Sequence, residues 1–189
     1  MHTHSYLVVA GSTRPLRRSP AIAGWVATMG EGACGGDFQV VDLHDLGLGL
    51  ADEPGIPALG IYTQATTQRW SDMVQAARGM VFVSPQYNWG YPAPLKNAID
   101  HLYREWRDKP AQIITYGSQG GGKCAAQLRE VLGGLGLNLT AAMPALRLAR
   151  TRIEADDGEV EPETDFAAQR EEVAEALQEL AALSLAGAI

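Results

Sequence analysis

Short apolar runs alternate with stretches of helical periodicity along almost the whole chain, and this alternation limits the possible folds more than any other feature. Strand-like runs occupy residues 6–10, 38–43, 80–83 and 111–116, and a less distinct fifth run lies within 139–148. Each run is followed, directly or after a loop, by apolar residues spaced as on one face of a helix. The alternation predicts a parallel sheet covered by helices on both faces.

The helical stretches have recognisable starts and faces. The first is expected to begin at Ser19-Pro20, with Ser19 as N-cap and Pro20 in the first turn. The second spans 66–77, after a Gly-, Pro- and Asp-rich loop over 44–61. Three further helical faces follow. The third helix carries Leu95, Ile99, Leu102 and Trp106, and the fourth carries Leu128, Val131, Leu132 and Leu135. The last comes after an acidic loop over 154–165 and carries Phe166, Val173, Leu177 and Leu180.

Length and strand number select among doubly wound folds. The chain has 189 residues, of which 46% are hydrophobic, and it contains no internal repeat or low-complexity linker. One domain over residues 1–189 with a sizeable core is therefore expected. Five strands are too few for the six-stranded Rossmann form. We predict an α/β fold, a flavodoxin-like doubly wound five-stranded parallel sheet of order 2-1-3-4-5.

Charge and composition argue against several partners. The formal net charge is −7 and there is no long Lys/Arg run, which disfavours nucleic-acid and membrane-surface binding. Neither a signal peptide nor a transmembrane stretch is apparent, so a cytoplasmic location is expected. Cys34 and Cys124 form no CxxC pair and are interpreted as unrelated thiols. His2 and His4 are assigned to a disordered terminus rather than to a metal site.

A stretch rich in hydroxyl and guanidinium groups follows the first strand. It opens with Gly11, which permits a tight turn, and ends where the first helix begins. A helix N-terminus beside such groups is suited to an anion, here a phosphate monoester. The alternative is an ordinary capped turn with solvated arginines. The residues concerned are Ser12, Thr13, Arg14, Arg17 and Ser19.

The loop after the third strand is unusually aromatic. Between Ser84 and Pro92 it carries Tyr87, Trp89 and Tyr91. Flat apolar faces next to amide groups suit a planar heterocycle whose rim bears carbonyls and ring nitrogens. The alternative is that these aromatic side chains seal the core or a subunit interface.

The loop after the fourth strand, residues 117–124, is rich in glycine. Repeated glycines let backbone N–H groups approach a ligand closely. The stretch nearly matches a P-loop, but Cys124 stands where the Mg²⁺-binding hydroxyl belongs, and P-loops usually follow the first strand. A nucleotide triphosphatase is therefore disfavoured, and Lys123 is interpreted as a surface lysine.

These three loops are expected to meet at one place. In the predicted topology, ligands bind beyond the carboxyl ends of the strands, at the switch between strands one and three. One loop offers anion binding, one an aromatic surface and one close backbone approach. Together they suit a phosphate joined to a flat ring system, as in FMN.

The same stretches resemble the NADPH-dependent FMN reductase family. The similarity rests on Gly11–Arg14 with Ser19, on 84–102 and on 116–123, and it covers the chain to about residue 140. The form Pro-Gln-Tyr-Asn-Trp-Gly-Tyr-Pro is closest to the quinone-reductase and azoreductase branch. Gln86 and Trp89 depart from the Pro-Glu-Tyr-Asn-Gly form of other branches, which leaves the acceptor undetermined.

The resemblance implies a role for each matching residue. Ser12, Arg14 and Ser19 would hold the FMN phosphate, assisted by Thr13 and Arg17. The isoalloxazine would be lined by Pro85, Gln86, Tyr87, Asn88 and Trp89. The loop beneath its pyrimidine end would contribute Gly117, Ser118, Gly120 and Gly121.

The resemblance also implies an activity. NADPH or NADH would deliver hydride to flavin N5, and a quinone, azo compound, chromate or free flavin would then take the electrons at the same face, in a ping-pong sequence. No side-chain acid or base is required; Tyr87 and His101 are interpreted as a structural tyrosine and a surface histidine. The alternative is a flavin-binding electron carrier or redox sensor with little turnover.

Family members are commonly oligomers, so a homodimer or homotetramer is expected. Leu95, Leu102 and Trp106 are candidates for the subunit face, with helix-to-sheet packing as their alternative role.

Overall fold

The sheet of this protein has the strand order predicted from the sequence. A computed structural model describes residues 5–155 and 157–186, so His2 and His4 lie outside the described residues. All strand pairs are parallel, and the order β2-β1-β3-β4-β5 is that of flavodoxin-like folds. The strands are β1 (Ser5–Ala10), β2 (Asp37–Asp42), β3 (Gly79–Pro85), β4 (Pro110–Gly117), β5 (Asn138–Leu139) and β6 (Ala145–Arg147).

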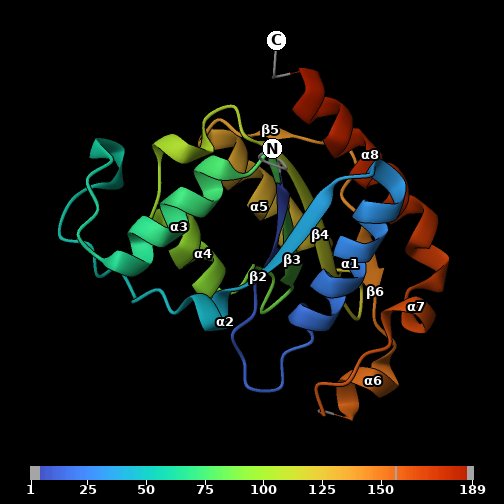
Figure 1. Ribbon diagram of the computed structural model, residues 1–189. Coiled ribbons are helices and arrows are strands. Elements are labelled where there is room, and N and C mark those ends of the chain that lie inside the picture. Colours follow the sequence, from blue (N-terminus) through green and yellow to red (C-terminus); the bar gives the residue numbers. More distant parts are fainter. Residues whose placement is uncertain (1–4, 156, 187–189) are drawn as a thin grey trace.

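Helices cover both faces of the sheet (Figure 1). One face packs against α1 (Ser19–Cys34) and α8 (Arg170–Ala186). The other packs against α3 (Ala65–Ala76), α4 (Ala93–Asp100) and α5 (Gly122–Gly134). Shorter helical pieces are α2 (Leu43–Leu46), α6 (Arg150–Glu154), α7 (Pro162–Asp165) and the 3₁₀ turns η1 (Pro57–Leu59), η2 (Arg104–Trp106) and η3 (Ala167–Gln169).

Side chains of the central strands point alternately to the two faces of the sheet, and a hydrophobic core forms on each face. In β1 the side chain of Val8 packs with one buried cluster, whereas its neighbours Leu7 and Val9 pack with the other. This is the two-residue alternation of a strand that is buried on both faces. Within the described ranges, none of the helices combines the length and hydropathy that crossing a bilayer requires.

The fifth strand is interrupted, which the sequence did not indicate clearly. β5 pairs with the start of β4 and β6 pairs with its end, so the sheet contains six strand segments. The buried side chain of Gln112 fills the gap between them: its amide nitrogen donates to the carbonyl oxygen of Ala142 at 3.0 Å, and its amide oxygen accepts from Thr140 Oγ1 at 2.6 Å. A side-chain amide thus replaces part of the strand ladder.

Two expectations about helix ends are wrong. Ser19 is not the N-cap of α1; Arg18 precedes the helix without a side-chain cap, and the Ser19 hydroxyl is used elsewhere. The predicted third helical face, Leu95 to Trp106, is not one helix, because α4 ends at Asp100 and Trp106 lies in η2.

The candidate subunit-face residues are buried within this chain. Leu95, Leu102 and Trp106 are each at most 2% exposed and belong to the core between α4 and the sheet, so packing is their role. His101 is likewise buried rather than on the surface. Its Nδ1 donates to the carbonyl oxygen of Asn97 at 2.8 Å, and its Nε2 lies 3.0 Å from Oδ1 of Asp52.

Candidate active site

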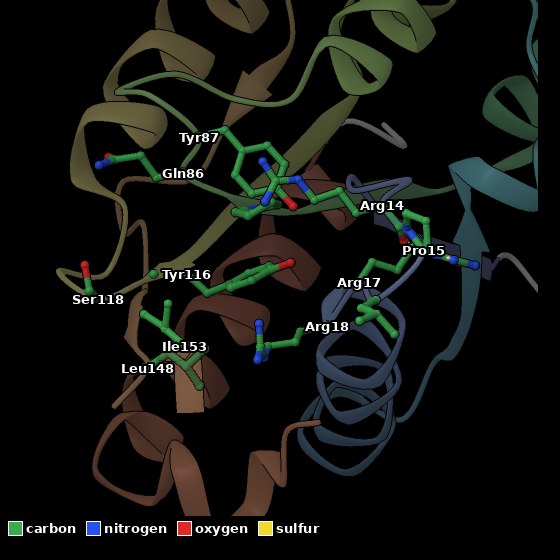
Figure 2. A pocket seen from close by; sticks show the side chains of 13 residues that line it. Arg14, Pro15, Arg17, Arg18, Gln86, Tyr87, Tyr116, Ser118, Leu148 and Ile153 are labelled. Carbon is green, nitrogen blue, oxygen red and sulfur yellow. Dashed lines mark hydrogen bonds between the residues drawn. The ribbon is translucent and has the colours of Figure 1, made fainter. Parts of the chain in front are cut away.

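A cavity of about 590 Å³ opens at the carboxyl edge of the sheet, where β1, β3 and β4 end (Figure 2). Seven of the sequence-predicted residues line it: Arg14, Arg17, Pro85, Gln86, Tyr87, Gly117 and Ser118. Six further lining residues were not predicted: Pro15, Leu16, Arg18, Tyr116, Leu148 and Ile153. The three loops expected to converge therefore do share one cavity, and a fourth segment of the chain adds a wall.

Two serine–tyrosine pairs support this cavity from behind. The Ser12 and Tyr87 hydroxyl oxygens are 2.7 Å apart, and so are those of Ser19 and Tyr116. The Ser12 backbone N–H also donates to Ser19 Oγ at 3.3 Å. Both serines are fully buried. The pairs tie the loop after β1 to the ends of β3 and β4, and they satisfy hydroxyl groups that would otherwise be costly to bury.

Tyr116 presents a neutral hydroxyl in this cluster. Burial raises its pKa well above the ordinary tyrosine value and outweighs the hydrogen bond with Ser19, which lowers it. The phenol is therefore protonated at neutral pH. It serves as a hydrogen-bond donor or acceptor and not as a charged group.

Three arginines give the cavity its charge, and they are held differently. The Arg14 guanidinium carbon lies 3.9 Å from the centre of the Tyr87 ring. Arg17 instead pairs with Asp42 at 2.8 Å, and Arg18 lies 3.6 Å from Asp157. Among the described residues Arg14 has no carboxylate partner, and no Asp or Glu lines the cavity. Arg14 is thus the guanidinium available to an anion at this site.

The aromatic loop after β3 forms a tight turn. Asn88 and Trp89 both have positive φ, 46° and 76°, and Tyr87 and Gly90 exchange backbone hydrogen bonds of 2.9 and 3.0 Å across them. This is the pattern of a type I′ turn, which is uncommon for a tryptophan. The Trp89 side chain is 66% exposed, with Lys123 Nζ 5.0 Å from its ring centre. Neither Asn88 nor Trp89 lines the cavity.

The Gln86 side chain caps a helix. Its Oε1 accepts the backbone N–H groups of Lys123 and Cys124, at 3.1 and 3.2 Å. These are the N–H groups at the start of α5, where a P-loop would hold a phosphate. The amide oxygen occupies that position, so a phosphate there would have to displace it.

The predicted glycines divide into two kinds. A Cβ added at Gly117 would have no neighbour closer than Gln86 Cβ at 4.0 Å, so this glycine leaves space within the cavity. A Cβ at Gly120 would come within 2.8 Å of Ala145, and one at Gly121 within 2.9 Å of Thr115. Both also have positive φ. Packing behind the cavity wall therefore accounts for Gly120 and Gly121, which do not line the cavity.

Thr13, Ser12 and Ser19 complete the predicted set without lining the cavity. Thr13 instead lines a different hollow, together with Leu48, Ala93 and Asn97. The two serines act through the tyrosines they contact. Tyr116 was missed because a residue near the end of a buried strand, here next to the last residue of β4, carries no sequence signal of its own.

Comparison with known proteins agrees with this geometry. The model of the family described as NADPH-dependent FMN reductase matches residues 5–147. The chain belongs to this family. It is 46% identical over 183 residues to an NAD(P)H-dependent FMN reductase of Schizosaccharomyces pombe, an alignment that covers 96% of this chain and 90% of that one. A Saccharomyces cerevisiae protein of the same description is 46% identical over 143 residues, 70% of this chain and 75% of that one.

A solved structure supports the fold. The flavoenzyme NAD(P)H:(acceptor) oxidoreductase of Paracoccus denitrificans superposes with a TM-score of 0.67 at 20% identity, covering 96% of this chain and 97% of that one. The resemblance noted in the sequence is confirmed, and this FMN reductase family member is an oxidoreductase that works with FMN and NAD(P)H.

The residues present fit FMN. A cavity of about 590 Å³ lies within the usual size range for small-molecule sites. Arg14 and the hydroxyls of the lining residues Tyr87 and Tyr116 suit a phosphate, and the faces of Pro85 and Tyr87 suit a flat ring. The space left at Gly117 lets a ring approach the backbone closely.

Proposed function

We propose that this protein uses FMN bound in the cavity to pass electrons from NAD(P)H to a small acceptor, by a ping-pong sequence. The acceptor class comprises quinones, azo compounds, chromate and free flavin. The observation that carries the proposal is one cavity that joins an arginine with no carboxylate partner among the described residues, aromatic faces and an open glycine.

The chain's own groups position the cofactor. Arg14 would hold the phosphate, helped by the Ser12–Tyr87 and Ser19–Tyr116 hydroxyl pairs. Pro85 and the Tyr87 backbone would line the ring. FMN, when bound, supplies the redox centre that takes a hydride from a nicotinamide and yields two electrons to an acceptor. The protein's part is to orient the ring and to leave one face open.

A shared binding place is the reason to expect ping-pong kinetics. The cofactor would occupy a cavity formed by one set of loops, so nucleotide and acceptor would reach the exposed face of its ring at the same place in turn. Double-reciprocal plots at several acceptor concentrations should therefore give parallel lines. Intersecting lines would exclude this order of events.

We also propose that the protein is a homodimer or homotetramer. The connection between α2 and α3 carries large apolar side chains that are more than half exposed, Leu50, Ile56, Leu59 and Ile61. This connection stands away from the rest of the chain (Figure 1). Hollows of about 370 and 440 Å³ lie beside it along α4. A face with both protruding side chains and recesses suits contact with a second copy of itself.

The first experiment is an anaerobic titration of the FMN-loaded protein with NADPH, followed by its visible absorbance. Bleaching by NADPH and recovery on adding a quinone, repeated over many turnovers, would support the proposal. A protein that takes up no FMN would overturn it. Reduction without sustained turnover would point to an electron carrier.

A matched pair of glycine variants tests the location of the cofactor. Gly117→Val places a side chain in the open space of the cavity and should weaken FMN binding roughly tenfold, a change of about 1.4 kcal/mol. Gly122→Ala adds a methyl group with no neighbour within 4 Å and should bind FMN like the parent. Equal FMN affinity in both variants would place the cofactor elsewhere.

A further inference from the structure

The cavity has a wall that lies outside the part of the chain matched by the family model. That match ends at residue 147, whereas Leu148 and Ile153 both line the cavity. We call residues 148–155 and 157–161 the outer wall. It contains the five-residue helix α6, which begins three residues after the end of β6. In Figure 2, Leu148 and Ile153 lie on the far side of Tyr116 from Tyr87.

Arg18 fastens the outer wall to the loop after β1. Its guanidinium donates to the carbonyl oxygen of Arg152 at 2.6 Å and to that of Glu159 at 3.1 Å, and lies 3.6 Å from the carboxylate of Asp157. The Arg18 side chain is only 13% exposed. Charge-assisted hydrogen bonds from a partly buried guanidinium are among the stronger polar contacts. Arg18 is therefore occupied by the outer wall rather than by an anion.

Close backbone packing adds a second fastening. Gly158 has φ of 79°, and a Cβ there would come within 3.1 Å of the backbone of Leu16. At the other end, Arg152 lies 3.3 Å from Asp165 and 3.5 Å from Glu161. The outer wall is thus held by the loop after β1 and by α7, and the position of Ile153 depends on these contacts.

Ile153 separates two hollows. One is the main cavity of about 590 Å³; the other, of about 360 Å³, is lined by Ser118, Gln119, Arg150, Ile153 and Glu154. Ser118 and Ile153 belong to both linings. Ile153 also packs against the core cluster that contains Leu148 and Val160. Shortening its side chain would join the two spaces, whereas enlarging it would reduce the first.

We propose that Ile153 is a specificity-determining residue that limits the size of the acceptor, and that Arg18 is the residue that positions it. The inference rests on the proposed function, since it concerns the acceptor that uses the FMN-containing cavity. The substrate class is planar quinones, with one-ring quinones accommodated by the parent and larger fused-ring quinones restricted by Ile153. Apolar side chains of this kind discriminate by about 10- to 200-fold when they add or remove space.

The test compares kcat/KM for a fused-ring quinone with that for benzoquinone, in FMN-loaded enzyme. Ile153→Ala should raise this ratio about tenfold, mainly through a lower KM for the larger quinone, and Ile153→Phe should lower it. Leu185→Ala, at a leucine on α8 that is 58% exposed and outside both the cavity and the proposed subunit face, is the control and should leave the ratio unchanged. Thermal unfolding of each variant checks that the fold is retained.

A double-mutant cycle tests the positioning role of Arg18. Arg18→Met should shift the ratio in the same direction as Ile153→Ala. Arg18→Lys should restore part of the parent ratio, since an ammonium group can keep some, but not all, of the guanidinium contacts with Arg152, Asp157 and Glu159. The effects of Arg18→Met and Ile153→Ala on the ratio should not add, because both release the same wall. Additive effects would overturn the positioning role.

The outcomes separate this inference from the proposed function. If Ile153→Ala changes both quinones equally, or only weakens FMN binding measured by fluorescence, the specificity role is wrong while the proposed function stands. If the parent protein shows no reduction of bound FMN by NAD(P)H, the proposed function fails and this inference fails with it.

Discussion

Two neighbouring connections at the carboxyl edge of the sheet have opposite character. The loop after β1, residues 11–18, contains the fully buried Ser12 and is followed directly by the fully buried Ser19. The connection over 47–64, between α2 and α3, instead exposes apolar side chains, with Leu50 83% and Ile61 69% accessible. Buried polar groups and exposed large apolar groups are both departures from the usual distribution of residues, and each calls for an explanation.

The two connections are also held in different ways. The loop after β1 is fixed by hydrogen bonds between its serine hydroxyls and two tyrosines, Tyr87 just after β3 and Tyr116 in β4. The 47–64 connection is fixed from the side: Asn97 on α4 accepts the backbone N–H of Ala51 at 3.1 Å and donates to the carbonyl oxygen of Gly49 at 2.8 Å. Its apolar side chains are thereby left free of the core. These differences agree with the proposed roles, in which the first connection serves a small ligand and the second a second copy of the chain.

The largest expected effect is on FMN affinity and comes from the positive charge of Arg14 in the first connection. Arg14→Ala should weaken FMN binding about 10- to 100-fold, because a hydrogen bond to a charged group contributes about 1.5–3 kcal/mol. Arg17→Ala is the matched control, since Arg17 already pairs with Asp42 and should affect FMN affinity much less. Fluorescence titration of the apoprotein with FMN measures both. Equal losses would mean that the Asp42 pair opens when the ligand binds.

Much of this connection was predictable from sequence for a topological reason. Parallel strands end at the same edge, so polar loops after strands one, three and four had to lie near one another. The turn glycine, the hydroxyls and the arginines were recognisable from residue type alone. What residue type does not give is pairing: whether Arg14 or Arg17 is free depends on Asp42, which comes from another strand.

Other parts of the site depend on distant packing and left no signal. Ile153 is an ordinary apolar residue just before the acidic loop, and it reaches the cavity through tertiary contacts of its segment, among them the hydrogen bond from Arg18 to the Arg152 carbonyl oxygen. Gly120 and Gly121 were recognised as special, but the reason lies in Ala145 and Thr115 rather than in a ligand. A glycine in the sequence shows that a side chain is not tolerated at that position, but it does not show which neighbouring atoms exclude one.

The exposed apolar side chains of the second connection give the next effect. Leu50→Ser and Ile61→Ser should each raise the dissociation constant of the oligomer about tenfold or more, since full burial of such a side chain contributes about 1.5–3 kcal/mol. Leu185→Ser, at a leucine that is 58% exposed on α8, should not change assembly. Sedimentation velocity over a range of concentrations measures the difference. A parent chain that stays monomeric would end the assignment of this face to a second copy.

Loss of the hydrogen bond between Ser19 and Tyr116 should have a smaller effect, on the free energy of unfolding. Tyr116→Phe removes one hydroxyl from the pair with Ser19 and should cost about 1 kcal/mol, the usual contribution of one hydrogen bond. For a chain of this length that corresponds to a fall of about 2–4 °C in Tm. Tyr103→Phe, at a tyrosine that is 46% exposed, is the control. An unchanged Tm in Tyr116→Phe would mean that the buried pair does not stabilise the loop.

A single carboxylate in the second connection gives the smallest and most local effect. Burial raises the pKa of Glu53, but hydrogen bonds from the backbone N–H groups of Thr63 and Gln64 and from nearby hydroxyls outweigh it and lower the pKa to about 2. Because the folded-state pKa is below the ordinary value of 4.5, the ionised carboxylate stabilises the connection at pH values above 4.5. That stabilisation is lost as the pH falls through about 2.

The amide chemical shifts of Thr63 and Gln64 report this titration directly, because both N–H groups donate to the Glu53 carboxylate. In the parent they should change with a midpoint near 2, and in Glu53→Gln they should stay constant over the same range. A midpoint close to 4.5 would show that the hydrogen bonds do not persist in solution. The 47–64 connection would then be fixed only by α4, and its apolar side chains would lack the rigid support that an interface with a second copy requires.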